Sequence, residues 1–98
     1  MDIRSEKYKK TLLDIIYEFL PHCRVYLFGS RVRKDHDEGA DIDLALDNNK
    51  PIDLRIIFKI NDKIEESTIP LFVDIVDINN SDQLIKKEIE GEGILWER

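Results

Sequence analysis

The sequence predicts an α/β (α+β) fold, with a small mixed β-sheet of three to four strands flanked by helices. Two observations favour this class. Apolar residues recur at three- and four-residue steps in separate segments, and short β-branched or aromatic runs lie between those segments. A third observation concerns size: the chain has 98 residues without an internal repeat, linker or low-complexity tract. We therefore expect a single domain over residues 1–98.

The N-terminal half is predicted to hold a helix and two strands. Residues 3–20 carry apolar side chains at helical spacing, and Pro21 cannot continue the helix. Residues 24–28 form an apolar run without polar alternation, which is typical of a central strand covered on both faces. The charged residues 31–40 indicate a surface loop or short helical turn. Residues 41–46 alternate, which places apolar and polar side chains on opposite faces of a strand: Ile42, Leu44 and Leu46 against Asp41, Asp43 and Ala45.

The next two elements are predicted to be a helix and a strand. A turn-forming cluster at residues 47–51 separates them from the preceding strand. Residues 52–64 return to helical spacing through four apolar positions: Leu54, Ile57, Phe58 and Ile64. Residues 71–78 then form a β-branched run between Pro70 and two asparagines, which is typical of a strand.

A short final helix is expected near the C-terminus. Ser81 is a suitable N-cap, and the glycine pair Gly91 and Gly93 would end the helix. The apolar residues 94–96 then form either a small edge strand or a tail packed on the core. Trp96 fits either closure of the core or an anchor for a partner, and we favour the core.

Charge and cysteine content narrow the possible functions. The chain has 15 Lys and Arg against 21 Asp and Glu, a formal net charge of −6. This balance argues against duplex DNA or a membrane as a partner, because both attract basic surfaces. A polyphosphate ligand would need a cation between it and this protein. Cys23 is the only cysteine, and the sequence lacks a signal-peptide pattern or a long apolar stretch, so we expect a cytoplasmic protein.

The acidic pair Asp41 and Asp43 is the first candidate for chemistry. Residues two apart on a strand point to one face with Cα atoms roughly 6.6 Å apart, so both carboxylates can reach one divalent ion or a close pair of ions. A third carboxylate can come from Asp74 or Asp77, which point to opposite faces of the last long strand. We choose Asp74, because it lies deeper in the apolar run, and keep Asp77 as the alternative. Oxygen ligands with room for water favour Mg²⁺ over zinc.

A second candidate site follows the first strand. Gly29 allows close approach of the backbone to a phosphate, and the Ser30 hydroxyl can donate a hydrogen bond to a phosphate oxygen. Arg31 and Arg33 follow at once, and a guanidinium binds phosphate groups in a bidentate manner. The densest basic cluster of an acidic chain therefore lies beside a predicted phosphate-binding turn.

These strings together resemble a known family. FGSRVRKDHDEGADIDLAL and the later VDIVD are similar to the minimal nucleotidyltransferases (MNT) of the DNA polymerase β superfamily: Gly-Ser, a spacer of about ten residues, Asp-x-Asp, then a third Asp on a later strand. The resemblance implies the polymerase β-like nucleotidyltransferase fold. It also implies that Asp41, Asp43 and Asp74 hold two Mg²⁺ ions and perform catalysis, with a triphosphate held by Gly29 and Ser30 and a further contact from Arg33. Arg31 is a nucleotide-binding candidate from its position beside them alone.

The resemblance further implies a biological role. Small proteins of this family are antitoxins of HEPN/MNT toxin–antitoxin pairs. Such an antitoxin transfers AMP from ATP to a hydroxyl of the HEPN toxin, in particular to a tyrosine hydroxyl. A non-catalytic antitoxin that neutralises its partner by complex formation is the alternative, because a small chain has little surface to hold an acceptor. An antibiotic-modifying adenylyltransferase subunit would need a further substrate domain. Because a chain of this size has a small core that a partner subunit would help to stabilise, a homo- or hetero-oligomer is compatible with the sequence.

Overall fold

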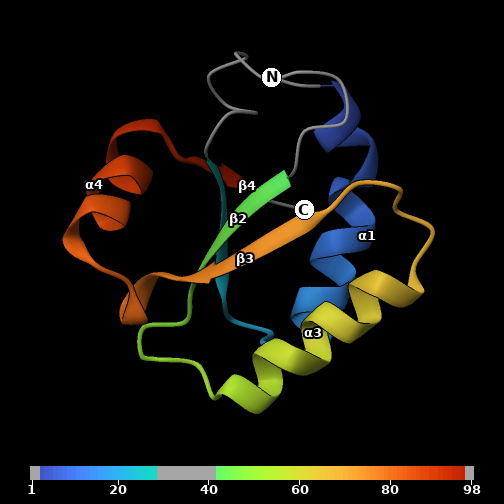
Figure 1. The fold of residues 1–98 in the computed structure, drawn as a ribbon, viewed down its shortest axis with the longest axis horizontal. Coiled ribbons are helices and arrows are strands. Elements are labelled where there is room, and N and C mark those ends of the chain that lie inside the picture. Colours follow the sequence, from blue (N-terminus) through green and yellow to red (C-terminus); the bar gives the residue numbers. More distant parts are fainter. Residues whose placement is uncertain (1–2, 29–41, 97–98) are drawn as a thin grey trace.

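The computed structural model of this protein describes residues 3–28 and 42–96. Three α-helices, four strands and one short 3₁₀ turn follow one another in these ranges, as Figure 1 shows. Their order is α1 (Ile3–Phe19), β1 (Arg24–Phe28), β2 (Ile42–Asp47), α3 (Leu54–Glu66), β3 (Val73–Asp77), η1 (Ile78–Asn80), α4 (Gln83–Glu92) and β4 (Ile94–Trp96).

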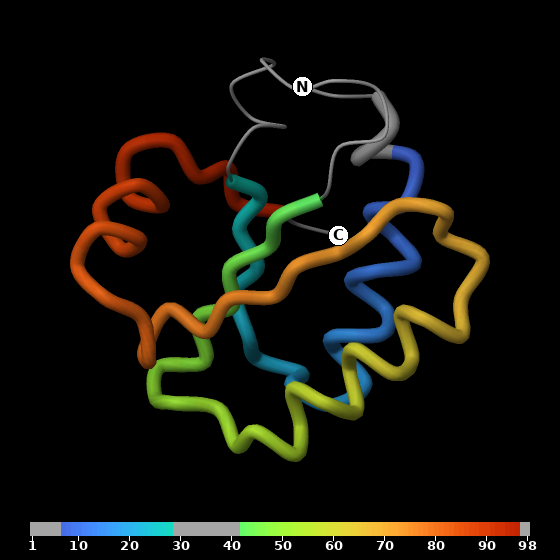
Figure 2. The backbone as a smooth tube through the Cα atoms, viewed as in Figure 1, coloured from blue at the N-terminus to red at the C-terminus, as the bar shows by residue number. Residues whose placement is uncertain are grey.

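The four strands form one mixed sheet in the order β3-β2-β1-β4. β1 pairs antiparallel with both β2 and β4, whereas β2 and β3 run parallel. The prediction that residues 24–28 form a central strand is therefore confirmed, and residues 94–96 form an edge strand. Figure 2 shows β2 and β3 side by side, although α3 separates them along the chain. A helical crossover of this kind is the usual way to connect parallel strands.

One face of the sheet carries the main core. α1 and α3 lie on this side (Figure 1). The alternation predicted for β2 is confirmed, because Ile42, Leu44 and Leu46 are all fully buried on this face. Trp96 of β4 joins the same core and is 1% exposed, so it closes the core, as we favoured.

Within residues 3–28 and 42–96, the opposite face of the sheet is covered only in part. α4 lies on this side (Figure 1) and packs Ile89 against Phe28 and Ala45, with Val76 at the margin of the cluster. Ala45 is fully buried there, whereas Asp43 is half-buried and Asp74 is exposed. α4 therefore leaves open the part of the sheet where these two carboxylates lie.

The helical face predicted for residues 52–64 is partly wrong. Ile60 and Ile64 are buried, but Leu54 and Phe58 are 63% and 61% exposed. At roughly 100° per residue, Ile56, Ile57, Ile60 and Ile64 form one stripe, and Leu54 and Phe58 lie on the side of the helix away from it. Two apolar residues that point away from the stripe were thus mistaken for part of it.

The predicted N-cap of the last helix is also wrong. Asp82, not Ser81, caps α4, and its carboxylate accepts a hydrogen bond from the Ile85 N–H at 3.0 Å. Ser81 instead ends the 3₁₀ turn and donates its hydroxyl to the Asp77 carbonyl oxygen. Of the two glycines, Gly91 lies inside α4, and Gly93 is the C-cap, donating its N–H to the Ile89 carbonyl.

Candidate active site

Asp43 and Asp74 are direct neighbours across the parallel pair β2 and β3. Neighbouring strands lie roughly 4.8 Å apart, and paired residues of parallel strands point to the same face. The two carboxylates therefore share one small area of the face that α4 leaves open. Apolar neighbours fix this orientation, because turning Asp43 to the other face would expose Ile42 and Leu44, both fully buried.

Asp77 faces the other side of the sheet and has a different role. Its carboxylate accepts a hydrogen bond from the Ile52 N–H at 2.8 Å and another from the Asn79 N–H at 3.1 Å. These bonds connect the end of β3 to the segment before α3 and to the 3₁₀ turn. The reason given for choosing Asp74 over Asp77 was wrong: Asp74 is exposed, and Asp77 is the half-buried one. Burial of Asp77 is compensated by its two backbone donors.

The remaining predicted site residues lie outside the described residues. These are Gly29, Ser30, Arg31, Arg33 and Asp41. The described ends of the flanking strands limit where the chain leaves and re-enters the sheet. β1 ends at Phe28, which pairs with Asp43, and β2 begins at Ile42, whose N–H donates to the Phe72 carbonyl at 2.9 Å. Residues 29–41 therefore connect two residues, Phe28 and Ile42, that adjoin the carboxylate pair.

The donor set of this area suits a hard divalent cation. Two carboxylates side by side repel each other, and a bound cation relieves that repulsion while using oxygen ligands, which Mg²⁺ prefers. Within residues 3–28 and 42–96, no group of three or more His, Cys, Asp or Glu side chains is placed to hold a metal. Two of the three predicted carboxylates therefore lie together among the described residues, and the predicted Asp41 lies outside them.

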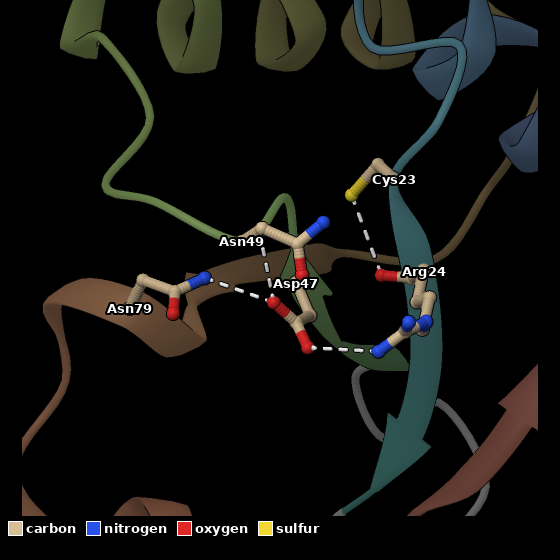
Figure 3. Close-up of polar contacts among 5 residues, drawn as sticks. All are labelled: Cys23, Arg24, Asp47, Asn49 and Asn79. Atoms are coloured by element: carbon tan, nitrogen blue, oxygen red, sulfur yellow. Dashed lines mark hydrogen bonds and ion pairs between the residues drawn. The ribbon is translucent and has the colours of Figure 1, made fainter.

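Asp47 shares the open face with Asp43 but is bound into the scaffold (Figure 3). Its carboxylate accepts hydrogen bonds from the Asn79 side chain at 2.9 Å and from the Asn49 N–H at 3.0 Å, and lies 3.6 Å from the Arg24 guanidinium. The Asn79 bond, then the Asn49 bond and the Arg24 charge, lower the pKa of Asp47. Sequence reasoning missed this link, because Asn79 and Asp47 are far apart in the chain.

Cys23 is a packing residue and is no nucleophile. The side chain is 4% exposed and its thiol donates a hydrogen bond to the Arg24 carbonyl (Figure 3). Burial raises the pKa of the Cys23 thiol to about 12, so the reactive thiolate is scarce at neutral pH.

The mixed sheet and the paired carboxylates of Asp43 and Asp74 are the features expected of a nucleotidyltransferase, and comparison with known proteins gives the same class. Residues 11–97 match the family described as "Polymerase beta, Nucleotidyltransferase". The chain belongs to this family, as its motifs suggested.

Similarity to individual proteins extends this result. The chain is 31% identical over 77 residues to a Haemophilus influenzae protein named "Probable protein adenylyltransferase MntA", covering 79% of this chain and 67% of that protein. The fold is similar to that of a chain in a crystal structure of a toxin–antitoxin with AMP-PNP, with a TM-score of 0.76 and 20% identity over 92% of this chain and 73% of that chain.

A second solved structure has the same fold. It is described as a tri-AMPylated Shewanella oneidensis HEPN toxin in complex with MNT antitoxin, with a TM-score of 0.73 and 19% identity over 96% of this chain and 73% of that chain. These likenesses confirm the predicted fold class. A separate structural result concerns membranes: none of the helices in the described ranges combines the length and apolar character that crossing a bilayer requires.

Proposed function

We propose that this protein is an Mg²⁺-dependent nucleotidyltransferase that transfers AMP from ATP to a hydroxyl, in particular a tyrosine hydroxyl, of a partner HEPN toxin, and so acts as its antitoxin. The observation that carries the proposal is the pairing of Asp43 with Asp74 on the open face of the sheet, in a chain of the nucleotidyltransferase family. The name of the Haemophilus influenzae relative supports protein adenylylation. The toxin–antitoxin structures with the same fold, with AMP-PNP in one and an AMPylated toxin in the other, support ATP and the HEPN partner.

Each predicted residue has a role in this reaction. Asp41, Asp43 and Asp74 would hold the metal ions. A triphosphate would be held by Gly29 and Ser30, with Arg31 and Arg33 neutralising part of its charge. Bound Mg²⁺ would supply charge neutralisation at the phosphates and help to lower the pKa of the attacking hydroxyl.

Asp74 is the carboxylate best placed to act on the acceptor. It lies on the edge strand β3 and is exposed, so an incoming hydroxyl can reach it. The acceptor oxygen forms a bond to the α-phosphorus as the bond from that phosphorus to the pyrophosphate oxygen breaks. The hydroxyl proton passes to the Asp74 carboxylate. Asp77 is excluded from this role in the proposal because its oxygens accept backbone hydrogen bonds on the other face.

Transfer of labelled AMP tests the proposal. The protein is incubated with α-labelled ATP, Mg²⁺ and the product of the adjacent gene as the candidate HEPN toxin, and that product is then assayed for covalent label. We expect transfer by the native chain and its loss in Asp43→Asn and Asp74→Asn. Asp62→Asn is the matched control, because Asp62 is an exposed carboxylate on α3. Absence of labelled toxin with the native chain, or equal labelling by the Asp43 and Asp74 variants, would contradict the proposal.

The second candidate is a binding module that neutralises the toxin without catalysis. The structure of a HEPN toxin in complex with MNT antitoxin, whose fold this chain shares, supports formation of such a complex. Protection of cells from the toxin separates the two functions. If Asp43→Asn still protects, binding is sufficient. A cytoplasmic location belongs to the main proposal, because ATP is an intracellular substrate and the chain has a single, free cysteine.

A further inference from the structure

A groove lies beside β3, at the edge of the sheet, and reaches the candidate active site. Its volume is about 480 Å³. α3 forms one wall through Asn61, Ile64 and Glu65, and residues 69–75 form the other. Asp74 therefore belongs both to the carboxylate pair and to this groove. Phe72, a residue that is 66% exposed, also lines it.

The outer edge of β3 offers main-chain hydrogen bonds along this groove. Among the described residues β3 has one neighbouring strand, β2, and is an edge of the sheet. The Phe72 carbonyl accepts from the Ile42 N–H, and backbone groups of alternate residues point the same way in a parallel pair. The groups of Phe72 and Asp74 thus point toward β2, whereas those of Val73 and Ile75 point outward. Such an edge can pair with an extended segment of another chain.

The charge of the groove indicates which kind of ligand it can bind. Its ionisable lining residues are Glu65 and Asp74, and neither Lys nor Arg is among the residues that line it, all of which belong to the described part of the chain. A triphosphate would be repelled from such a surface, whereas a segment with a basic residue would be attracted. A second copy of this chain is disfavoured, because each copy carries a net charge of −6.

Sheet order gives the direction from which the acceptor arrives. β1 and β3 lie on opposite sides of β2. The residues proposed to hold the phosphates follow β1 directly, after Phe28, which pairs with Asp43. In phosphoryl transfer the attacking and leaving oxygens are roughly in line. A pyrophosphate leaving toward β1 therefore requires an acceptor that approaches over β3, where the groove lies.

We propose that the groove beside β3 binds the acceptor segment of the partner: an extended stretch with a tyrosine and a neighbouring basic residue. The segment pairs with the outer edge of β3, the tyrosine ring packs on Phe72, and the basic residue faces Glu65. This placement brings the phenolic hydroxyl to Asp74. The phenolic oxygen gains the bond to the α-phosphorus, pyrophosphate leaves, and the proton goes to Asp74. The inference rests on the proposed function and adds to it the binding mode and class of the acceptor.

Steady-state kinetics with the toxin as acceptor test the role of Phe72. We expect Phe72→Ala to raise the KM for the toxin roughly tenfold while the KM for ATP stays within about twofold, and Phe72→Tyr to restore the native value. Phe58→Ala is the matched control, because Phe58 is similarly exposed at 61% but lies on α3 outside the groove. A raised KM for ATP, or an unchanged KM for the toxin, would overturn the proposal.

Synthetic acceptor peptides test charge and strand pairing without altering the protein. A short peptide with a tyrosine flanked by lysines should be modified more efficiently than one flanked by glutamates, and Glu65→Lys should reverse this preference. N-methylation of peptide amides at alternate positions should block transfer in one register and be tolerated in the other, since only alternate amides face β3. Equal use of both charge types, or tolerance of methylation at every position, counts against pairing with β3.

Binding measured without nucleotide separates this inference from the proposed function. If the native chain transfers no AMP but binds the toxin, and Phe72→Ala weakens that binding, the proposed function fails and the groove remains the partner site. If Phe72→Ala binds the toxin with native affinity, the groove proposal fails whatever the activity. A native dimer that Phe72→Ala dissociates would show that a second copy occupies the edge, and would also overturn the proposal.

Discussion

Substitution of the two aspartates of β3 should separate stability from activity: loss of Asp77 should lower stability, and loss of Asp74 should lower activity. Asp77→Ala removes the acceptor for the Ile52 and Asn79 N–H groups. Hydrogen bonds to a charged acceptor contribute roughly 1.5–3 kcal/mol each when buried. Asp77 is half-buried, so the lower end applies, and we expect a loss of about 2–4 kcal/mol. For a chain of this size that is a decrease in Tm of roughly 10 °C or more.

Asp74→Asn should leave stability almost unchanged. No hydrogen bond or ion pair joins the Asp74 side chain to another described residue, and the side chain is exposed. The change also removes repulsion from the adjacent Asp43, so we expect a shift within about 0.5 kcal/mol in either direction. AMP transfer should nevertheless fall by roughly two orders of magnitude or more, because a proposed metal ligand is lost.

Urea and thermal unfolding followed by circular dichroism, together with the AMP transfer assay, give both quantities for each variant. Asp77→Asn is the graded control: its amide oxygen keeps one acceptor, so stability should fall less than in Asp77→Ala while transfer persists at a temperature where the variant is folded. The reasoning is refuted if Asp77→Ala unfolds at the native denaturant concentration, or if Asp74→Asn loses more than about 1 kcal/mol.

Three further predictions concern the scaffold. Gly91→Ala should stabilise α4 by about 0.5–1 kcal/mol, because an added Cβ meets no atom within 4 Å. Gly93→Ala should destabilise the protein by about 1–3 kcal/mol, because its Cβ would lie 2.5 Å from the Ile89 carbonyl oxygen. Chemical denaturation of both variants measures the two changes in unfolding free energy. Cys23 should resist thiol reagents in the native protein at pH 8 and react at once in denaturant, since burial raises the pKa of its thiol to about 12; rapid native labelling would contradict its burial. The pKa of Asp47 is lowered in the folded state, so its stabilising effect is present above about pH 4 and is lost as pH falls below that value. Asp47→Asn should accordingly show a smaller loss of Tm between pH 5 and pH 3 than the native chain, and an identical pH dependence would show that Asp47 contributes none of it.

The sequence was sufficient for the elements and for part of the site. The apolar run of β1 predicted a central strand, and the alternation of β2 predicted which face Asp43 shares. Both predictions follow from a period of two residues, which is fixed by local geometry. The same period predicted that Asp74 and Asp77 point to opposite faces.

The predictions from sequence were wrong where two neighbouring residues, or two faces of one helix, suited the same role about equally well. Asp82 and Ser81 are adjacent and both are suitable N-caps, and only the preceding 3₁₀ turn decides that Ser81 is used elsewhere. On α3 the apolar residues cover more than one face, so packing against the sheet decides that Leu54 and Phe58 stay exposed. These are choices between neighbours, and they depend on contacts with distant elements.

The sequence alone indicated which residues are candidates for chemistry: the Gly29-Ser30 pair, the Asp41 and Asp43 pair and a later aspartate, in an acidic chain. Tertiary structure decided which aspartate is the partner of Asp43. The parallel register of β2 and β3 pairs Asp43 with Asp74, while backbone donors from Ile52 and Asn79 occupy Asp77. Register and burial arise from long-range packing, and a one-dimensional pattern does not carry that information.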